Sequence, residues 1–202
     1  KKDILKICEK HNDCEFLIFT NSTLIDEEFI DEMLRLKNIV PAISVEGSEF
    51  TTDARRGDGI YNKVIKSMKL LKDNKLPFGI SCCYTSQNYK SIISEEFVDE
   101  MIERGALFAW YFHFMPVGKG TGKELLPKPD QRKHIYHQLR KFRKTKLLFF
   151  LDLQNDAEYI GGCIAGGRNY LHINANGDLE PCVFIHYSDS NIKEKTLVES
   201  LQ

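Results

Sequence analysis

Short apolar runs alternate along the chain with longer segments whose apolar residues recur at helical spacing. The apolar runs predict five β-strands, over residues 14–20, 39–45, 78–85, 107–114 and 147–151. The segments between them predict helices over residues 26–36, 59–73, 94–104 and 129–143, and residues 3–10 predict the end of another helix. Asp26 and Ser94 each stand at a helix start where a side-chain oxygen is expected to cap the first turn.

The predicted strands are apolar along nearly their whole length, which is typical of a parallel sheet covered on both faces, with helices as the crossovers. A closed barrel of eight such units needs roughly 250 residues. About five units fit before the pattern changes near Asp152. We therefore predict an α/β fold for residues 1–151, either an open sheet or a partial TIM-like (β/α) barrel. The Gly- and Asn-rich residues 152–202 predict a small appended β domain.

That second segment contains the most informative pattern in the chain. Cys163 and Cys182 flank an Asn176-Gly177 pair, and short alternating runs lie on either side of it, over residues 170–174 and 179–184. Asn-Gly is a strong signal for a β-hairpin because both residues tolerate positive φ. A hairpin would carry Cys182 back towards Cys163. Two thiols brought together in this way indicate half of a metal or cluster site.

The composition of the chain excludes several functions. Of its 202 residues 42% are hydrophobic and 28% charged, and the net charge of −1 gives no support for nucleic-acid binding. The basic stretch 132–146 is interleaved with Ile135, Tyr136, Leu139 and Phe142, as in the solvent-facing side of an amphipathic helix. No apolar run reaches the roughly 18 residues of a membrane span, and no signal peptide precedes the first helix. The six cysteines form no dense framework, which favours a reducing compartment such as the cytoplasm.

Polar residues collect where four consecutive predicted strands end, which is where parallel α/β folds bind ligands. The four groups are Thr20-Asn21-Ser22, then Ser44 to Gly47 followed by Asp53 and Arg55-Arg56, then Thr85 to Asn88, and finally Met115 to Gly120. Together they offer hydroxyls and carboxylates for a ribose or amine, a guanidinium for a carboxylate and an apolar edge for a flat ring. Any one of these residues could instead cap a helix or turn; four consecutive strand ends favour a binding site.

Other motifs carry less information. The Gly118–Lys123 loop has neither the spacing nor the Ser or Thr of a phosphate-binding loop, although Lys119 or Lys123 could meet an anionic substrate. Cys82 and Cys83 are strand neighbours that face opposite sides and are expected to be buried as small hydrophobes.

The histidines leave further alternatives open. His134 and His137 are one helical turn apart. This spacing permits metal binding, but a partly exposed basic helix surface also explains both residues. His113, at a strand end, is a candidate for substrate contact. His172 and His186 allow a zinc site with Cys163 and Cys182.

Taken together, these residues resemble the radical S-adenosylmethionine (SAM) enzymes that carry a C-terminal auxiliary-cluster extension of the SPASM or shorter twitch type. The matching segments are FLIFTNSTLID (residues 16–26), ISVEGSEFTTDARRGDG (43–59), YTSQN (84–88), FMPVGKG (114–120) and Cys163-x13-Gly177-x4-Cys182. The resemblance covers essentially the whole chain.

The resemblance implies an oxidoreductase or maturase that reductively cleaves SAM to a 5′-deoxyadenosyl radical and abstracts hydrogen from a substrate. Ser44, Glu46 and Arg56 would lie near the ribose, amino and carboxylate groups of SAM, with Thr20, Asn21 and Asn88 also at the cofactor. The segment from Phe114 through Met115 to Val117 would line the adenine. Cys163 and Cys182 would ligate an auxiliary iron–sulfur cluster. A flavodoxin or ferredoxin would donate the electron, and the substrate could be a peptide, a cofactor or a lipid.

The chain departs from that family in one essential motif. The Cys-x3-Cys-x2-Cys loop that holds the catalytic 4Fe–4S cluster is absent, and Cys8 and Cys14 cannot replace it. The later cysteines of the extension are absent too. We therefore expect the chain to be an inactive fragment, with residues 1–151 a partial barrel and 152–202 a truncated auxiliary domain. The alternatives are a zinc-stabilised, non-catalytic α/β binding domain and a small α/β enzyme acting on phosphorylated compounds.

Overall fold

The structure is a computed structural model that describes residues 1–118, 122–165 and 168–201. The chain divides into two compact units. The first combines residues Lys1–Phe114 with Gly122–Leu153, and the second combines Met115–Thr121 with Gln154–Gln202.

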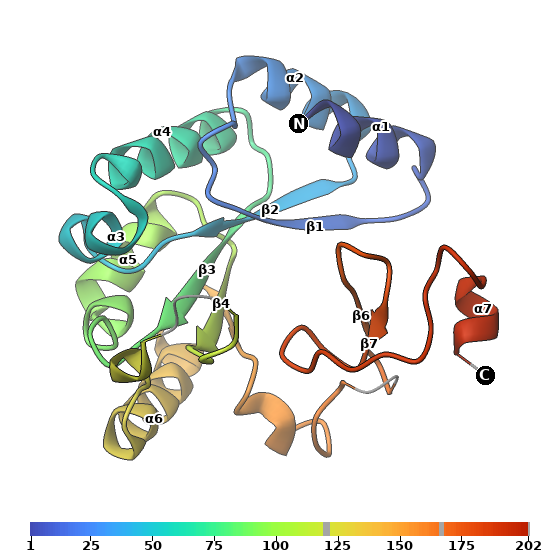
Figure 1. The fold of residues 1–202 in the computed structure, drawn as a ribbon. Helices are drawn as coiled ribbons and strands as arrows, with labels where there is room; N and C mark the ends of the chain where they lie inside the picture. Colours follow the sequence, from blue (N-terminus) through green and yellow to red (C-terminus); the bar gives the residue numbers. More distant parts are fainter. Residues whose placement is uncertain (119–121, 166–167, 202) are drawn as a thin grey trace. The chain divides into compact units, whose positions relative to one another are not determined.

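The first unit is built on a five-stranded parallel sheet (Figure 1). Its strands are β1 (Phe16–Thr20), β2 (Ile39–Ser44), β3 (Gly79–Tyr84), β4 (Phe108–His113) and β5 (Phe149–Asp152). They lie side by side in the order in which they occur along the chain, and every neighbouring pair is parallel. This arrangement confirms the predicted α/β fold, in which helices supply the crossovers between parallel strands. Strands β1 to β4 are one or two residues shorter than predicted, and β5 begins two residues later and ends one residue later than predicted.

The helices of this unit are α1 (Lys2–Lys10), α2 (Glu27–Leu36), α3 (Glu49–Arg56), α4 (Ile60–Asp73), α5 (Glu95–Glu103) and α6 (Pro129–Thr145). The two predicted caps are confirmed: Asp26 accepts a hydrogen bond from the Phe29 amide at 2.9 Å and Ser94 accepts one from the Phe97 amide at 3.1 Å. Helix α3 was not predicted. Its sequence holds few apolar residues, and Thr52 is the residue of α3 that becomes buried.

One face of the sheet carries the main core. Ile43 and Ile80 are fully buried there, as are Cys82, Tyr84 and Tyr111. Residues at alternate positions point to the other face, where aromatic rings from β1 and β4 meet. The ring centroids of Phe19 and Trp110 are 5.3 Å apart, and those of Trp110 and Phe112 are 5.5 Å apart.

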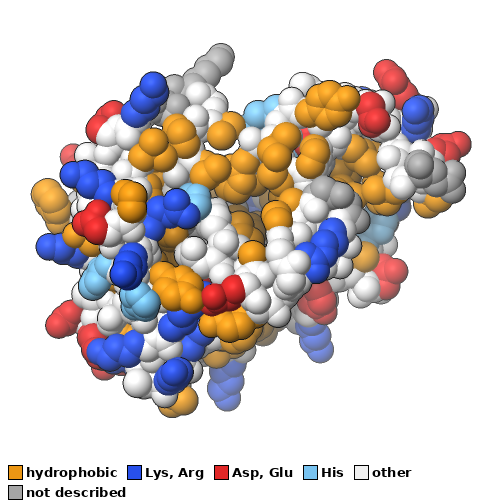
Figure 2. Space-filling view, turned by 90° about the horizontal axis from the view of Figure 1, so that it is seen from below, with side chains coloured by type: hydrophobic (Ala, Val, Ile, Leu, Met, Phe, Trp, Pro, Cys, Tyr) orange, Lys and Arg blue, Asp and Glu red, His pale blue; other side chains and the backbone are white. Residues whose placement is uncertain are grey.

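Helix α6 confirms the reading of the basic stretch as an amphipathic helix. Its buried residues are Gln131, Ile135, Leu139 and Phe142. Its other side presents Lys, Arg and His side chains to solvent, which Figure 2 shows as the blue and pale-blue surface on the left. None of the helices that the structure describes is both long and apolar enough to cross a membrane.

The second unit contains a short antiparallel hairpin formed by β6 (His172–Ile173) and β7 (Leu179–Glu180), and a final helix, α7 (Leu197–Ser200). The predicted hairpin is confirmed, but its turn differs from the expected two-residue Asn-Gly turn. The Gly177 amide donates to the Asn174 carbonyl at 2.9 Å, and Gly177, with φ of +94°, adopts positive φ whereas Asn176 does not. The turn therefore begins at Asn174, and only its last position needs glycine.

Candidate functional site

The candidate site centres on the carboxylate of Glu46, two residues beyond the end of β2. This side chain is fully buried, and four hydrogen bonds reach its two oxygens. Arg56 donates to Oε1 through Nε at 3.0 Å and also through Nη2. Arg55 donates to Oε2 through Nη1 at 2.7 Å, and Asn88 donates to the same oxygen through Nδ2 at 3.2 Å. Glu46 is thus held by groups from two different strand ends.

The local sequence explains how the two arginines reach Glu46. The Ser48 hydroxyl accepts a hydrogen bond from the Thr51 amide and caps α3 directly after β2. The helix is only two turns long, so its last residues, Arg55 and Arg56, lie where their side chains can fold back over Glu46. Gly57 ends the helix with φ of +105°, a conformation that favours glycine.

Asn88 links this group to the loop after β3. Its Oδ1 accepts hydrogen bonds from the amide of Thr85 at 2.7 Å and from the Thr85 hydroxyl at 3.0 Å. Its Nδ2 donates to Glu46 and to the carbonyl of Cys83 at 3.1 Å. The loops after β2 and β3 are therefore joined by one buried amide whose oxygen and nitrogen are both used.

The electrostatics of the group favour an anionic part of a ligand, such as a carboxylate. One carboxylate faces two guanidinium groups, which leaves one positive charge in excess. Burial lowers the pKa of Arg55, but the adjacent Glu46 carboxylate and Cys83 raise it by more, so the guanidinium stays charged. Burial raises the pKa of the Cys83 thiol, and the nearby Arg55 charge only partly opposes this. Cys83 is therefore a neutral thiol at neutral pH.

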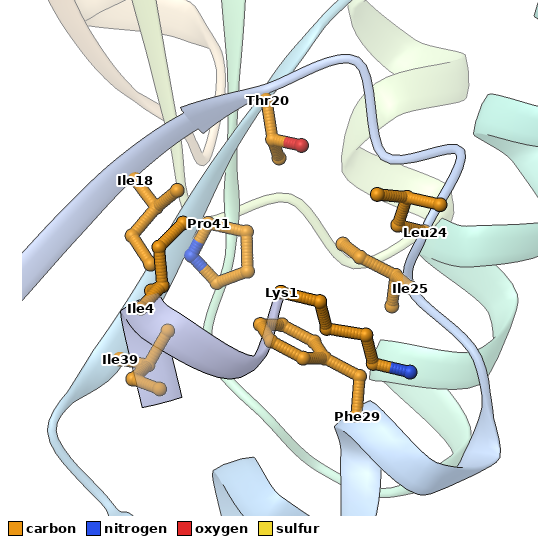
Figure 3. Close-up of a pocket in the computed structure, with 9 residues that line it drawn as sticks. All are labelled: Lys1, Ile4, Ile18, Thr20, Leu24, Ile25, Phe29, Ile39 and Pro41. Carbon is orange, nitrogen blue, oxygen red and sulfur yellow. The ribbon is translucent and has the colours of Figure 1, made fainter. Parts of the chain in front are cut away.

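Thr20 and Asn21, at the end of β1, are engaged in their own turn. The Thr20 hydroxyl accepts a hydrogen bond from the Ser22 amide at 3.0 Å, and Asn21 Oδ1 accepts one from the Thr23 hydroxyl at 3.0 Å. Thr20 is in register with Ile43, so it points to the sheet face opposite to that of Ser44. There it borders an apolar pocket between α1, α2, β1 and β2, alongside Ile18 and Pro41 (Figure 3). The structure thus joins Glu46, Arg56 and Asn88 and places Thr20 and Ser44 on different faces.

The predicted adenine segment is divided between the two units. Phe114 ends the first unit, where its amide donates to the Tyr84 carbonyl at 2.9 Å, while Met115 and Val117 belong to the second unit. Residues 119–121 of the neighbouring Gly-Lys loop lie outside the described part of the chain. The adenine role of this segment and an anion-binding role for Lys119 stay predictions.

His113, at the end of β4, is half-buried and lies edge-on to the ring of Tyr84, with ring centroids 5.9 Å apart. Burial, with a smaller contribution from the charge of Arg132, lowers the pKa of His113 to about 4. The imidazole is therefore neutral at pH 7. It can take part in hydrogen bonding there but carries no positive charge.

The predicted cluster cysteines lie in the second unit. Cys163 is exposed, and its sulfur accepts a weak hydrogen bond from the Ala165 amide at 3.5 Å. The Arg168 guanidinium donates hydrogen bonds to the carbonyls of Ile160 at 2.6 Å and Cys163 at 3.1 Å. Cys182 lies just beyond β7 and is half-buried.

No group of three or more His, Cys, Asp or Glu side chains is placed to hold a metal ion within residues 1–118, 122–165 and 168–201. The described part of the chain thus provides no zinc site from Cys163, Cys182, His172 and His186, and no metal site at His134 and His137. Instead, His186 Nδ1 lies 3.2 Å from the buried Glu180 carboxylate, which also accepts a hydrogen bond from Asn174 at 2.9 Å.

Sequence reasoning missed two roles at the site. The resemblance implies a role for Arg56 alone of the Arg pair, yet Arg55 contacts both Glu46 and the Cys83 carbonyl. Asp53 is one of the polar residues predicted to line a ligand site. Its carboxylate instead accepts hydrogen bonds from the amides of Gly59 and Tyr61 at the start of α4, each at 2.7 Å. The sequence carried no direct signal for the second role, because Asp53 lies within α3 and a capping residue is normally recognised directly before the helix that it caps.

Comparisons with known proteins support the fold. No protein-family model matches the chain. Uncharacterized protein MJ0907 of Methanocaldococcus jannaschii is 25% identical over 181 residues, which cover 86% of this chain and 59% of that protein. SuiB from Streptococcus suis, in a crystal structure bound to S-adenosylmethionine, superposes with a TM-score of 0.76 at 22% identity, over 98% of this chain and 50% of SuiB.

Native anSMEcpe with bound AdoMet, another name for SAM, superposes with a TM-score of 0.72 at 20% identity, over 100% of this chain and 61% of that one. The chain thus spans between half and about three fifths of the length of the proteins it matches. At these identities the shared property is the fold.

Proposed function

We propose that the chain forms the SAM-binding portion of a radical SAM enzyme. The observation that carries this proposal is the buried Glu46 group at the carboxyl ends of β2 and β3, with its excess guanidinium charge, in a fold shared with SuiB bound to SAM. In parallel α/β folds this edge of the sheet is the common ligand site. SAM carries a carboxylate and a ribose, which suit guanidinium, hydroxyl and amide groups.

The residues present fit SAM better than they fit iron–sulfur clusters. Ser44, Arg55, Arg56 and Asn88 supply hydroxyl, guanidinium and amide groups at one edge of the sheet. Bound beside SAM, a 4Fe–4S cluster would supply the electron for reductive cleavage. The sequence holds six cysteines in all, and none forms Cys-x3-Cys-x2-Cys. The cluster ligands would therefore come from elsewhere in the enzyme.

The proposal of an auxiliary domain rests on Cys163 and Cys182, the two thiols whose spacing matches the SPASM or twitch pattern. Two thiolates fall short of the four ligands usual for an iron–sulfur cluster. On this proposal, residues 152–202 begin an auxiliary domain whose remaining ligands lie outside the 202 residues. An electron donor such as a flavodoxin or ferredoxin belongs to the same proposal.

The substrate is proposed to be a peptide. A crystal structure shows SuiB bound to precursor peptide SuiA, and a solved structure shows native anSMEcpe with bound AdoMet and the Kp18Cys peptide. Both proteins share the fold of this chain. A cofactor or lipid substrate is the alternative, and fold alone does not choose among these classes.

The proposal is tested by isothermal titration of the purified 202-residue chain with SAM. We expect saturable binding, and we expect Ser44→Ala to weaken it without changing the melting temperature. Thr145→Ala, which removes an exposed hydroxyl at the last residue of α6, outside every candidate group, is the control. Absence of SAM binding by the wild-type chain would count against the proposal.

A further inference from the structure

Helix α6 concentrates positive charge in a chain that has almost no net charge. Six of its 17 residues are Lys or Arg and Asp130 is its one acidic residue, whereas the whole chain has a net charge of −1. The rest of the chain is therefore net acidic. The apolar side of α6, with Ile135, Leu139 and Phe142, is buried in the core, so its positive side is the one that other molecules can reach (Figure 2).

The exposed charges form a stripe along the helix, made up of Lys133, His137, Lys141 and Lys144. These positions are spaced by four, four and three residues, so their side chains lie on one face of α6. At the rise of an α-helix the stripe is about 16 Å long. An extended polypeptide covers this length with about five residues.

The charges at the two ends of the stripe are not neutralised. Within the described part of the chain Lys133 and Lys144 form no ion pair, whereas Lys141 pairs with Glu95 of α5 at 2.7 Å. Lys146, just beyond the end of α6, pairs with Asp99 of α5 at 2.6 Å. The unpaired ammonium groups are thus available to the carboxylates of another molecule.

The neighbouring helix α5 favours a narrow partner. Glu95, Glu96 and Asp99 are exposed on α5, and the ion pairs to Lys141 and Lys146 place them beside α6. A nucleic-acid strand carries a phosphate at every nucleotide, and a broad contact would set phosphates against these carboxylates. An extended peptide with acidic residues at alternate positions avoids them, because its acidic side chains lie on one side roughly 7 Å apart. Successive members of the stripe are about 5–6 Å apart, which is a close match.

We propose that the stripe of Lys133, His137, Lys141 and Lys144 is a docking surface for an acidic polypeptide segment of another protein. The segment binds in an extended conformation with its acidic side chains at alternate positions. This inference is independent of the proposed SAM-binding function, because it rests on the charges of α6 and not on the Glu46 group.

The test measures the fluorescence anisotropy of a fluorescein-labelled octapeptide of alternating Glu and Thr, titrated with the 202-residue chain at about 0.15 M salt. We expect saturable binding, and none when Gln replaces Glu in the peptide. Lys133→Glu together with Lys144→Glu should weaken binding about tenfold or more, because two favourable charge contacts become repulsive.

The matched control is Lys2→Glu together with Lys6→Glu, at two exposed positions of α1. It changes the net charge by the same amount and should leave the affinity within about twofold, because salt screens distant charges. Circular dichroism melting curves check that both double variants are folded. The single variants Lys133→Glu and Lys144→Glu, each expected to cause part of the loss, replace a double variant that does not fold.

Three results would overturn the proposal. If the Glu-Thr peptide does not bind the wild-type chain, the stripe is not a docking surface for acidic segments. An equal loss of affinity in the α1 control would trace binding to the net charge rather than to the stripe. If an oligothymidylate with the same number of charges displaces the labelled peptide as well as unlabelled peptide does, the surface does not distinguish a polypeptide from a nucleic acid.

Discussion

The ring of Phe108 on β4 lies against Gly79 at the paired position of β3, so closely that a Cβ added at Gly79 would be 2.4 Å from two ring carbons. Glycine is needed here for space rather than for backbone conformation. The two residues belong to the sheet face that also carries Trp110 and Phe112. A side chain at position 79 would therefore displace the ring and strain the contact between the two strands.

We expect Gly79→Ala to lower the free energy of unfolding by about 1–3 kcal/mol, the usual cost of overpacking. Urea denaturation followed by circular dichroism measures this. In a Phe108→Ala background the ring is gone, so the same substitution should cost much less. An equal cost in both backgrounds would show that the strain does not come from Phe108, because a double-mutant cycle isolates their interaction.

Glu46→Gln tests the buried charge group. The substitution removes the negative charge and leaves two guanidiniums facing each other across an amide. Breaking a buried ion pair commonly costs 3–5 kcal/mol, and since both arginines reach solvent we expect about 3 kcal/mol here. Glu49→Gln, the same change at an exposed position of α3, is the control and should alter the unfolding free energy little. If Glu46→Gln left the free energy of unfolding nearly unchanged, Glu46 would not form the buried ion pairs with Arg55 and Arg56 that the structure shows.

Asp53→Ala tests the cap of α4. The carboxylate accepts the amides of Gly59 and Tyr61, which would otherwise be left without partners at the helix start. We expect a loss of about 1–2 kcal/mol in urea denaturation. Asp58→Ala, at an exposed position of the same loop, is the matched control. If both substitutions cost the same, the cap does not explain the role of Asp53.

The strand and helix order could be predicted because apolar runs and helical spacing follow burial. Examples are the nearly continuous apolar segment that contains Ile43 and the capped helix start at Ser94. It missed α3 because that helix is held by Ser48, Gly57 and the Glu46 contacts rather than by an apolar face. The site was only partly predictable for the same reason. Strand-end polarity singled out Glu46, Arg56 and Asn88, whose side chains the structure brings together, but the contacts of Arg55 depend on three-dimensional geometry.

The lowered pKa of His113 makes the free energy of unfolding depend on pH. Its folded-state value of about 4 lies below the value of about 6.5 expected in the unfolded chain. The unfolded state therefore binds more protons between these values, and stability falls as the pH drops from about 6.5 to about 4. The loss is complete below pH 4 and absent above pH 7.

Urea denaturation of wild type and His113→Gln between pH 4 and pH 8 measures this contribution. The difference in unfolding free energy between the two should be constant above pH 7 and should shift in favour of the variant as the pH falls towards 4. Arg132→Gln is a second check, because it removes the positive charge that makes the smaller contribution to the lowered pKa of His113. The pH range over which stability falls should then become narrower, while burial still keeps the folded-state pKa low. A difference independent of pH would contradict the neutral, desolvated state of His113.

In the second unit, Gly177→Ala tests the hairpin turn that precedes Cys182. Gly177 has φ of +94°, and a Cβ there would lie 2.9 Å from Asn191 Oδ1. The substitution therefore combines an unfavourable backbone conformation with a close contact. The carbonyl of Gly177 also accepts the Ile192 amide at 2.9 Å, so distortion of the turn reaches the following segment.

We expect faster hydrogen exchange at the amides of Ile192 and Leu179, the latter bonded to the Ser190 carbonyl at 2.9 Å. Asn176→Ala, at the neighbouring turn position with ordinary φ, is the matched control and should leave both amides protected. Equal protection in the glycine variant would show that the hairpin does not depend on Gly177. The Gly-x4-Cys spacing would then reflect something other than the geometry of this turn, and the structural argument for Cys182 as a cluster ligand would lose its support.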